Sequence, residues 1–185
     1  MRDTTLVVVT ADHGEEFQEH GHLTHGSHLY EESVHVPLVL VGPGVASGRR
    51  ADEAQGIDLY PTLAAFLGGG TPPDLPGRDL LATRAGQPVI VETNRGIGPD
   101  GGALRLVAVR DARWKLIHTP ALGRFELYDL GHDPAERDDR WPGAGEGDAL
   151  AALIADWAPE DVVAAVPGSQ DPAFGAKLRA LGYVE

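Results

Sequence analysis

The stretch Leu6-Val7-Val8-Val9-Thr10-Ala11-Asp12-His13-Gly14-Glu15 joins an apolar run to a polar turn. A short β-branched run with no helical period predicts a buried strand, here residues 4–10. Asp12 and His13 stand at its carboxyl end, and in open α/β sheets this is the edge where ligands bind. A carboxylate and an imidazole can both ligate a divalent cation. The stretch therefore predicts an α/β fold with half of an active site at one edge of its sheet.

The segment that follows is polar and irregular. Residues 12–35 contain six of the eight histidines, at positions 13, 20, 22, 25, 28 and 35. A second apolar strand is predicted over 36–41, with Pro37 near its start, where a missing N–H group is tolerated. Residues 57–67 have the apolar spacing of an amphipathic helix, with Pro61 in its first turn.

The pattern changes near residue 86. Four short strands with turn-length separators predict an antiparallel meander, at 88–92, 103–110, 113–119 and 125–130. Two helices are predicted after them, at 148–157 and at 173–181, the second ended by Gly182. We therefore divide the chain into an α/β part, an antiparallel subdomain and a helical tail, with the bounds 1–86, 87–135 and 136–185.

Composition excludes several classes of protein. With 185 residues, of which 42% are hydrophobic, the chain can form a packed core. The formal charge of −13 argues against a nucleic-acid partner, and the absence of cysteine excludes disulfides and thiolate metal sites. No stretch is long enough to be a membrane span, and no charged start leads into an apolar signal segment. The location, cytoplasmic or exported, stays open.

Short motifs follow one another along nearly the whole chain. They are Asp12-His13-Gly14-Glu15-Glu16, Glu19-His20-Gly21, His25-Gly26, Leu29-Tyr30-Glu31-Glu32, Val36-Pro37-Leu38, Asp58-Leu59-Tyr60-Pro61-Thr62-Leu63, Ala108-Val109-Arg110-Asp111-Ala112-Arg113-Trp114-Lys115-Leu116, Glu126-Leu127-Tyr128-Asp129-Leu130, Asp133-Pro134 and Leu178-Arg179-Ala180-Leu181-Gly182-Tyr183. Each motif is weak alone, but their ordered succession is specific and resembles the sulfatase family of the alkaline-phosphatase-like superfamily.

The resemblance implies a fold and an incomplete active site. Residues 1–86 would be the C-terminal part of an α/β/α sandwich that forms the catalytic domain, followed by a small antiparallel β-sheet subdomain with C-terminal helices. Family members also carry an earlier Asp-Asp pair and a Cys- or Ser-centred motif whose residue becomes formylglycine. This sequence has no cysteine and no Ser-x-Pro-x-Arg. We therefore expect a C-terminal portion with little turnover by itself, whose partner is the missing N-terminal portion.

The same resemblance assigns roles to four residues. Asp12 and His13 would be the second pair of metal ligands, with Gly14 allowing the backbone turn that brings both to one ion. Calcium is expected and Mn²⁺ or Mg²⁺ is the alternative, because an imidazole ligand makes the site softer. His25 stands where relatives commonly have a lysine that contacts the sulfate and protonates the leaving oxygen. An imidazole can do this if an acidic neighbour keeps it charged, and His20 is the alternative catalytic residue.

Three functions are compatible with these residues. The first is hydrolysis of sulfate monoesters, with a sulfated small molecule or carbohydrate as substrate. The second is hydrolysis of phosphonate monoesters or phosphodiesters, and the third is a non-catalytic remnant. Arg95, after the strand at 88–92, is the basic residue of the antiparallel part that we consider for an acidic substrate. Arg113 and Lys115 fit an ordinary two-faced strand.

Overall fold

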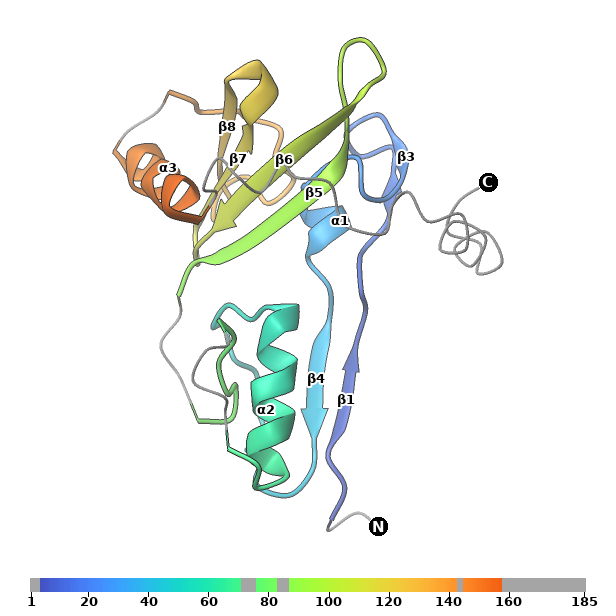
Figure 1. The fold of residues 1–185 in the computed structure, drawn as a ribbon, viewed down its shortest axis with the longest axis vertical. Helices are drawn as coiled ribbons and strands as arrows, with labels where there is room; N and C mark the ends of the chain where they lie inside the picture. The colour runs from blue at the N-terminus through green and yellow to red at the C-terminus, as the bar shows by residue number, and fades with distance from the viewer. Residues whose placement is uncertain (1–3, 71–75, 83–86, 143–144, 158–185) are drawn as a thin grey trace. The chain divides into compact units, whose positions relative to one another are not determined.

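Residues 4–70, 76–82, 87–142 and 145–157 are described by the computed structural model shown in Figure 1. The chain divides into two units, Met1–Ile154 and Ala155–Glu185, and the fold below is that of the described residues of the first. The predicted helix at 173–181 and its terminating Gly182 lie outside the described residues. The predicted part boundaries near residues 86 and 135 remain predictions.

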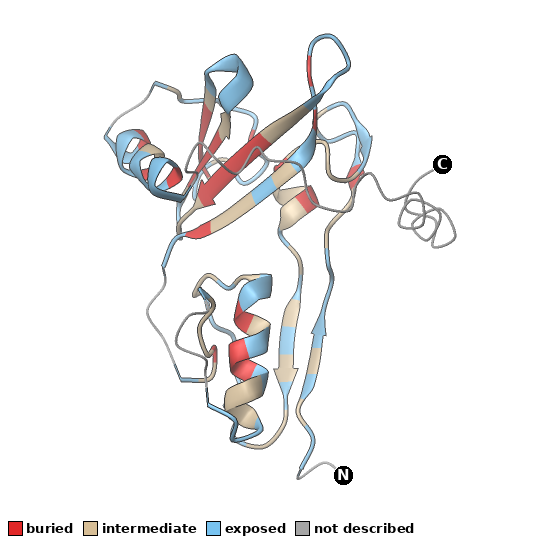
Figure 2. Cartoon of the chain, in the orientation of Figure 1, coloured by how far each residue is buried: buried red, intermediate tan, exposed pale blue. Residues whose placement is uncertain are grey.

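The two apolar strands of the α/β part form a ribbon. β1 (Val7–Thr10) pairs antiparallel with β4 (Leu38–Val41), and both are shorter than predicted. Four valines of one face are between 48% and 60% exposed: Val7, Val9, Val39 and Val41. Figure 2 shows that half-buried and exposed residues alternate along β4. The prediction of a buried strand at 4–10 is therefore wrong for this chain, because no described element packs on that face.

The histidine-rich segment contains more regular structure than its sequence indicates. β2 (Glu16–Phe17) and β3 (Leu23–Thr24) form a small antiparallel hairpin. A single helical turn, α1 (Glu31–Val34), follows it. Glu31 and Glu32 lie in the first turn of α1, where negative charge is favoured by the exposed N–H groups. The segment thus ends in a short helix that holds two glutamates in defined positions.

The predicted helix at 57–67 is confirmed. A 3₁₀ turn, η1 (Gly56–Asp58), leads into α2 (Leu59–Phe66). The buried Asp58 carboxylate accepts N–H groups from Gln55 and from Arg78, which ties the helix start to a later loop. Among the described helices, none is both long enough and apolar enough to cross a membrane.

The antiparallel meander is also confirmed. Its strands are neighbours in chain order, and each pairs antiparallel with the next: β5 (Val89–Ile97), β6 (Ala103–Arg110), β7 (Trp114–Thr119) and β8 (Arg124–Asp129). A short 3₁₀ turn, η2 (Pro120–Leu122), joins the last two strands, and α3 (Glu146–Trp157) follows. β5 is longer than predicted and contains a register shift between Thr93 and Gly96.

Both faces of this sheet are covered. On one face, Leu150 and Ile154 of α3 pack in a cluster with strand residues such as Leu116. On the other face, Leu29 of the histidine-rich segment packs in a cluster that includes Ile117 and Tyr128. Neighbouring strand residues therefore face opposite layers, as the pleat of a sheet requires. The segment that carries the candidate site residues is thus anchored on the antiparallel sheet.

Candidate functional site

Asp12 and His13 lie where β1 ends, and their side chains converge. Asp12 Oδ2 is 3.8 Å from His13 Nε2. The Nδ1–H group of His13 donates a hydrogen bond of 2.7 Å to the carbonyl oxygen of Gly14. In this tautomer the lone pair of Nε2 is available to a metal ion. Two metal–ligand bonds of about 2.0 to 2.5 Å can span the gap between the two atoms.

Gly14 holds this pair against α1. Its N–H group donates to the carbonyl oxygen of Ser33 at 2.9 Å. A Cβ atom at this position would lie 1.9 Å from the carbonyl oxygen of Glu32. Gly14 is not among the glycines with positive φ. Gly14 is therefore not needed for the predicted backbone turn. It is needed because two backbone segments approach each other more closely than any side chain allows.

His25 lies directly on His13. The two rings stack with centroids 3.7 Å apart and an angle of 20° between their planes. Nδ1 of His25 is 3.4 Å from the carboxylate of Glu15. Glu15 is thus the acidic neighbour that a charged imidazole at this position needs. The sequence prediction did not assign this role to Glu15, although the residue belongs to the quoted motif.

These side chains share one cavity. Asp12, His13 and His25 line an open cavity of about 250 Å³ together with His28 and with Thr93 of β5. The structure therefore brings together three of the four residues predicted for the site. The cavity is formed by the histidine-rich segment and by the antiparallel sheet, so both parts of the chain contribute to it.

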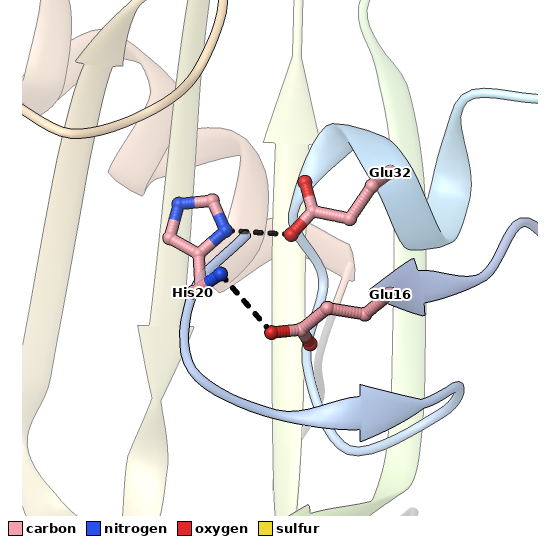
Figure 3. Close-up of side chains that lie close together, drawn as sticks. All are labelled: Glu16, His20 and Glu32. Atoms are coloured by element: carbon pink, nitrogen blue, oxygen red, sulfur yellow. Dashed lines mark hydrogen bonds and ion pairs between the residues drawn. The ribbon is translucent and has the colours of Figure 1, made fainter. Parts of the chain in front are cut away.

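His20 lies apart from this cavity lining, in a cluster with Glu16 and Glu32 (Figure 3). Its Nδ1 donates to Glu32 at 2.6 Å, and its Nε2 donates to the carbonyl oxygen of Glu136 at 3.1 Å. One carboxylate oxygen of Glu16 accepts the backbone N–H group of His20 at 3.2 Å. The ligand atoms of the three side chains lie within 4.8 Å of one another. Because both ring nitrogens of His20 face acceptors, neither lone pair is free for a metal ion, and the geometry favours an ion pair.

The ion pair of His20 predicts a pH-dependent stability. Burial lowers the pKa of His20, but its hydrogen bonds to Glu32 and to the Glu136 carbonyl outweigh burial and raise the pKa above 6.5. A histidine whose pKa is raised in the folded state contributes its full stabilisation below the ordinary pKa of 6.5. This contribution is lost as the pH rises through the folded-state pKa. We expect His20→Gln to remove this slope and to cost about 2 kcal/mol at pH 6. Urea unfolding between pH 5.5 and 8.5 measures both effects.

Glu32→Gln provides the matching variant for this test. It keeps a hydrogen-bond acceptor but removes the negative charge beside the imidazole ring. We therefore expect it to reduce the same slope. An unchanged pH dependence in His20→Gln would show that the ion pair contributes nothing to stability.

Lys115 is a buried cation that the sequence prediction placed on an ordinary two-faced strand. Its side chain is 1% exposed, and its Nζ donates to Glu31 at 3.1 Å. Nζ also lies 2.9 Å from the fully buried carboxylate of Glu136. The second oxygen of Glu136 accepts the N–H group of Glu31, the first residue of α1, at 2.6 Å. Lys115 therefore fixes α1, and with it the site segment, to β7.

The sequence is similar to those of known sulfatases. Residues 1–69 match the family model for sulfatases. A choline-sulfatase of Rhizobium meliloti (strain 1021) is 32% identical over 143 residues, which cover 74% of this chain and 27% of that relative. The chain thus spans about a quarter of the length of this curated relative.

Solved structures with the same fold belong to related hydrolases. A 2-O GAG sulfatase matches with a TM-score of 0.71 and 28% identity, over 82% of this chain and 35% of that chain. A phosphonate monoester hydrolase from Silicibacter pomeroyi matches with a TM-score of 0.62 and 28% identity, over 82% of this chain and 33% of that chain. These similarities confirm the predicted alkaline-phosphatase-like α/β fold with its antiparallel C-terminal sheet.

Proposed function

This chain belongs to the sulfatase family, and from that premise we propose that it carries one part of the active site of a metal-dependent hydrolase of sulfate monoesters. The observation that supports this most is the convergence of Asp12, His13 and His25 on one cavity. A metal ligand pair and a proton donor are two of the three elements that ester cleavage requires. The third, a nucleophile, is proposed to come from outside this sequence, which contains no cysteine.

Asp12 and His13 are the proposed metal ligands. The free Nε2 of His13 and the Oδ2 of Asp12, 3.8 Å apart, fit two positions of one coordination shell. Calcium is the proposed ion, with Mn²⁺ or Mg²⁺ as the alternative. When bound, a divalent cation neutralises negative charge on the sulfuryl oxygens. Asp12 is 74% exposed at its side chain, so the carboxylate is accessible to an ion from solvent.

His25 is the proposed proton donor to the leaving oxygen. The carboxylate of Glu15 lies 3.4 Å from its Nδ1. The stacked ring of His13 fixes the plane of the imidazole next to the metal ligands. His20 is the weaker candidate, because both of its ring nitrogens are engaged by Glu32 and by the Glu136 carbonyl.

Metal binding tests the assignment of Asp12 and His13. In the full-length protein, we expect the double variant Asp12→Ala/His13→Ala to weaken Ca²⁺ or Mn²⁺ binding about a hundredfold, because both ligand atoms are removed. Isothermal titration calorimetry measures the change. Asp148→Ala, which removes an exposed carboxylate on α3, is the control and should leave the affinity unchanged. Equal affinity of the double variant and the native protein would overturn the assignment.

The phosphonate monoester hydrolase among the structural neighbours supports a second candidate function. Assays of the full-length protein with an aryl sulfate and with a phosphonate monoester, each with Ca²⁺ or Mn²⁺, distinguish the two. Preference for the sulfate supports the first proposal, and preference for the phosphonate supports the second. We expect no meaningful turnover from residues 1–185 alone, because the covalent step lacks its nucleophile. A burst of sulfate release by this chain would contradict that expectation.

The names of two relatives each contain a sulfated compound. One of them is named for choline sulfate and another for a hexuronate 2-O-sulfate. The first substrate carries a positive charge beside the ester, and the second carries a carboxylate. We propose a sulfated small molecule or carbohydrate as the substrate.

A further inference from the structure

We infer that Arg95 is a specificity residue that binds a second anionic group of the substrate, a carboxylate or a further sulfate next to the ester that is cleaved. This inference rests on the proposed function, since it concerns the same cavity. It assigns the substrate to the acidic sulfated saccharides rather than to neutral or cationic sulfate esters.

A bulge in β5 places Arg95. Thr93 pairs with Leu106 and Gly96 pairs with Leu104, so three steps along β5 match two steps along β6. The extra residue breaks the alternation of side chains and gives Arg95 a direction that a regular strand would not. Gly96 is required there, because a Cβ atom would lie 1.8 Å from a side-chain carbon of Leu106 and 2.9 Å from the carbonyl oxygen of Leu104.

Thr93 connects this bulge to the turn that carries His25. Its hydroxyl donates to the carbonyl oxygen of Gly26 at 2.8 Å and accepts the backbone N–H group of Arg95 at 3.1 Å. One side chain therefore fixes the backbone of Arg95 relative to His25 and Gly26. Thr93 also lines the cavity that contains Asp12 and His13.

The side chain of Arg95 extends over Gly26. A Cβ atom built on Gly26 would lie 3.7 Å from Cδ and 3.9 Å from Nε of Arg95. Gly26 has a positive φ of 86°, which L side chains rarely adopt, and it leaves this space open. Gly26 lines the cavity and follows His25, so the side chain of Arg95 lies beside a residue of the proposed active site.

Arg95 has no acidic partner in the part of the chain that the structure describes. Arg105, on the neighbouring strand, pairs with Glu92, and Arg110 pairs with Glu31 and Glu53. The exposed guanidinium group of Arg95 is available to an anionic group of a substrate. A guanidinium group binds carboxylate and sulfate oxygens through two parallel hydrogen bonds.

A matched set of substrates tests the inference on the full-length protein. The first is a sulfated disaccharide with a uronic acid carboxylate, the second its carboxyl-reduced counterpart, and the third the reduced form with a second sulfate. For Arg95→Gln we expect a tenfold to hundredfold loss in kcat/KM, mainly through KM, on the first and third substrates. On the second substrate, kcat/KM should change less than about threefold. Arg95→Lys should recover part of the loss, because it restores the charge without the planar fork.

Arg137→Gln is the control, since it removes an exposed arginine from the loop after β8. Its kinetic constants should equal those of the native protein on all three substrates. A loss limited to the first substrate identifies a carboxylate as the ligand, and a loss limited to the third identifies a sulfate. An equal loss on all three, or no loss on any, would overturn the inference while the proposed function stands.

A binding measurement distinguishes a failure of the proposed function from a failure of the role inferred for Arg95. If the native protein hydrolyses none of the three esters, the proposed function fails. Calorimetric titration of the native and Arg95→Gln proteins with the uronic disaccharide and its reduced form then tests Arg95 alone. Tighter binding of the acidic form that disappears in Arg95→Gln supports the inference, and equal affinities overturn it.

Discussion

Lys115→Met is expected to destabilise the fold by about 3 to 5 kcal/mol, because it removes the cation beside the fully buried carboxylate of Glu136. Lys115 Nζ lies 3.1 Å from Glu31 and 2.9 Å from Glu136, whose side chains are 14% and 0% exposed. Methionine keeps the aliphatic stem but leaves the Glu136 carboxylate without the ammonium group beside it, while Glu31 keeps Arg110 at 3.4 Å. Urea unfolding of native and variant protein at pH 7.5 measures the difference.

The expected loss depends on pH in a defined direction. Burial raises the pKa of Glu136, and Lys115 works against this rise. Without Lys115, the carboxyl group should take up a proton at a higher pH than in the native protein, and a neutral carboxyl costs less to bury. The deficit of Lys115→Met should therefore shrink as pH falls toward 5.

Two variants are the controls for Lys115→Met. Arg140→Met breaks an ion pair with Asp138 in which both side chains are exposed, and such pairs contribute less than about 1 kcal/mol. The double variant Lys115→Met/Glu136→Gln also removes the orphaned charge of Glu136 and should recover part of the stability. If Lys115→Met costs no more than Arg140→Met, the buried network does not hold α1 to the sheet.

Gly14→Ala is expected to cost about 3 kcal/mol and to weaken divalent-cation binding at the Asp12–His13 pair. The new methyl group would lie 1.9 Å from the carbonyl oxygen of Glu32, and neither backbone segment can accept it without moving. The hydrogen bond from Gly14 to Ser33 would lengthen as the end of β1 moves away from α1. Denaturation and calorimetric titration of the full-length protein measure the two effects.

Gly56→Ala is the control for this prediction. A Cβ atom on Gly56 would meet nothing within 4 Å, and Gly56 is not among the glycines with positive φ. The substitution should be neutral or slightly stabilising, because it reduces the entropy of the unfolded chain. The close approach of Gly14 to α1 would be refuted if both variants kept native stability and native metal affinity.

The local elements followed from the sequence. β6 has the predicted bounds, β7 begins one residue later than predicted, and β8 begins and ends one residue earlier. Alternating apolar residues and turn-length separators depend only on neighbours in the chain, so they can be read without a structure. α2 was predicted for the same reason, from its apolar spacing. The hairpin of β2 and β3 has no such pattern and was missed.

The environment of individual residues did not follow from the sequence. Lys115 alternates with apolar neighbours on a strand, as a surface lysine would, yet it is buried against Glu31 and Glu136. The valines of β1 have the pattern of a core strand, yet one face of the ribbon is exposed. Burial depends on which distant segments pack on a residue, and no local pattern contains that information.

The amino-acid sequence by itself determined that a carboxylate and an imidazole follow a strand and that four strands form a meander. These properties depend on covalent neighbours and on the period of the β-strand. Only the tertiary structure decided that His25 stacks on His13, that His20 belongs to a separate ion pair and that Arg95 lies over Gly26. Each of these contacts depends on how the histidine-rich segment packs on the antiparallel sheet. A close-packed interior leaves few other arrangements for the side chains between this segment and the sheet.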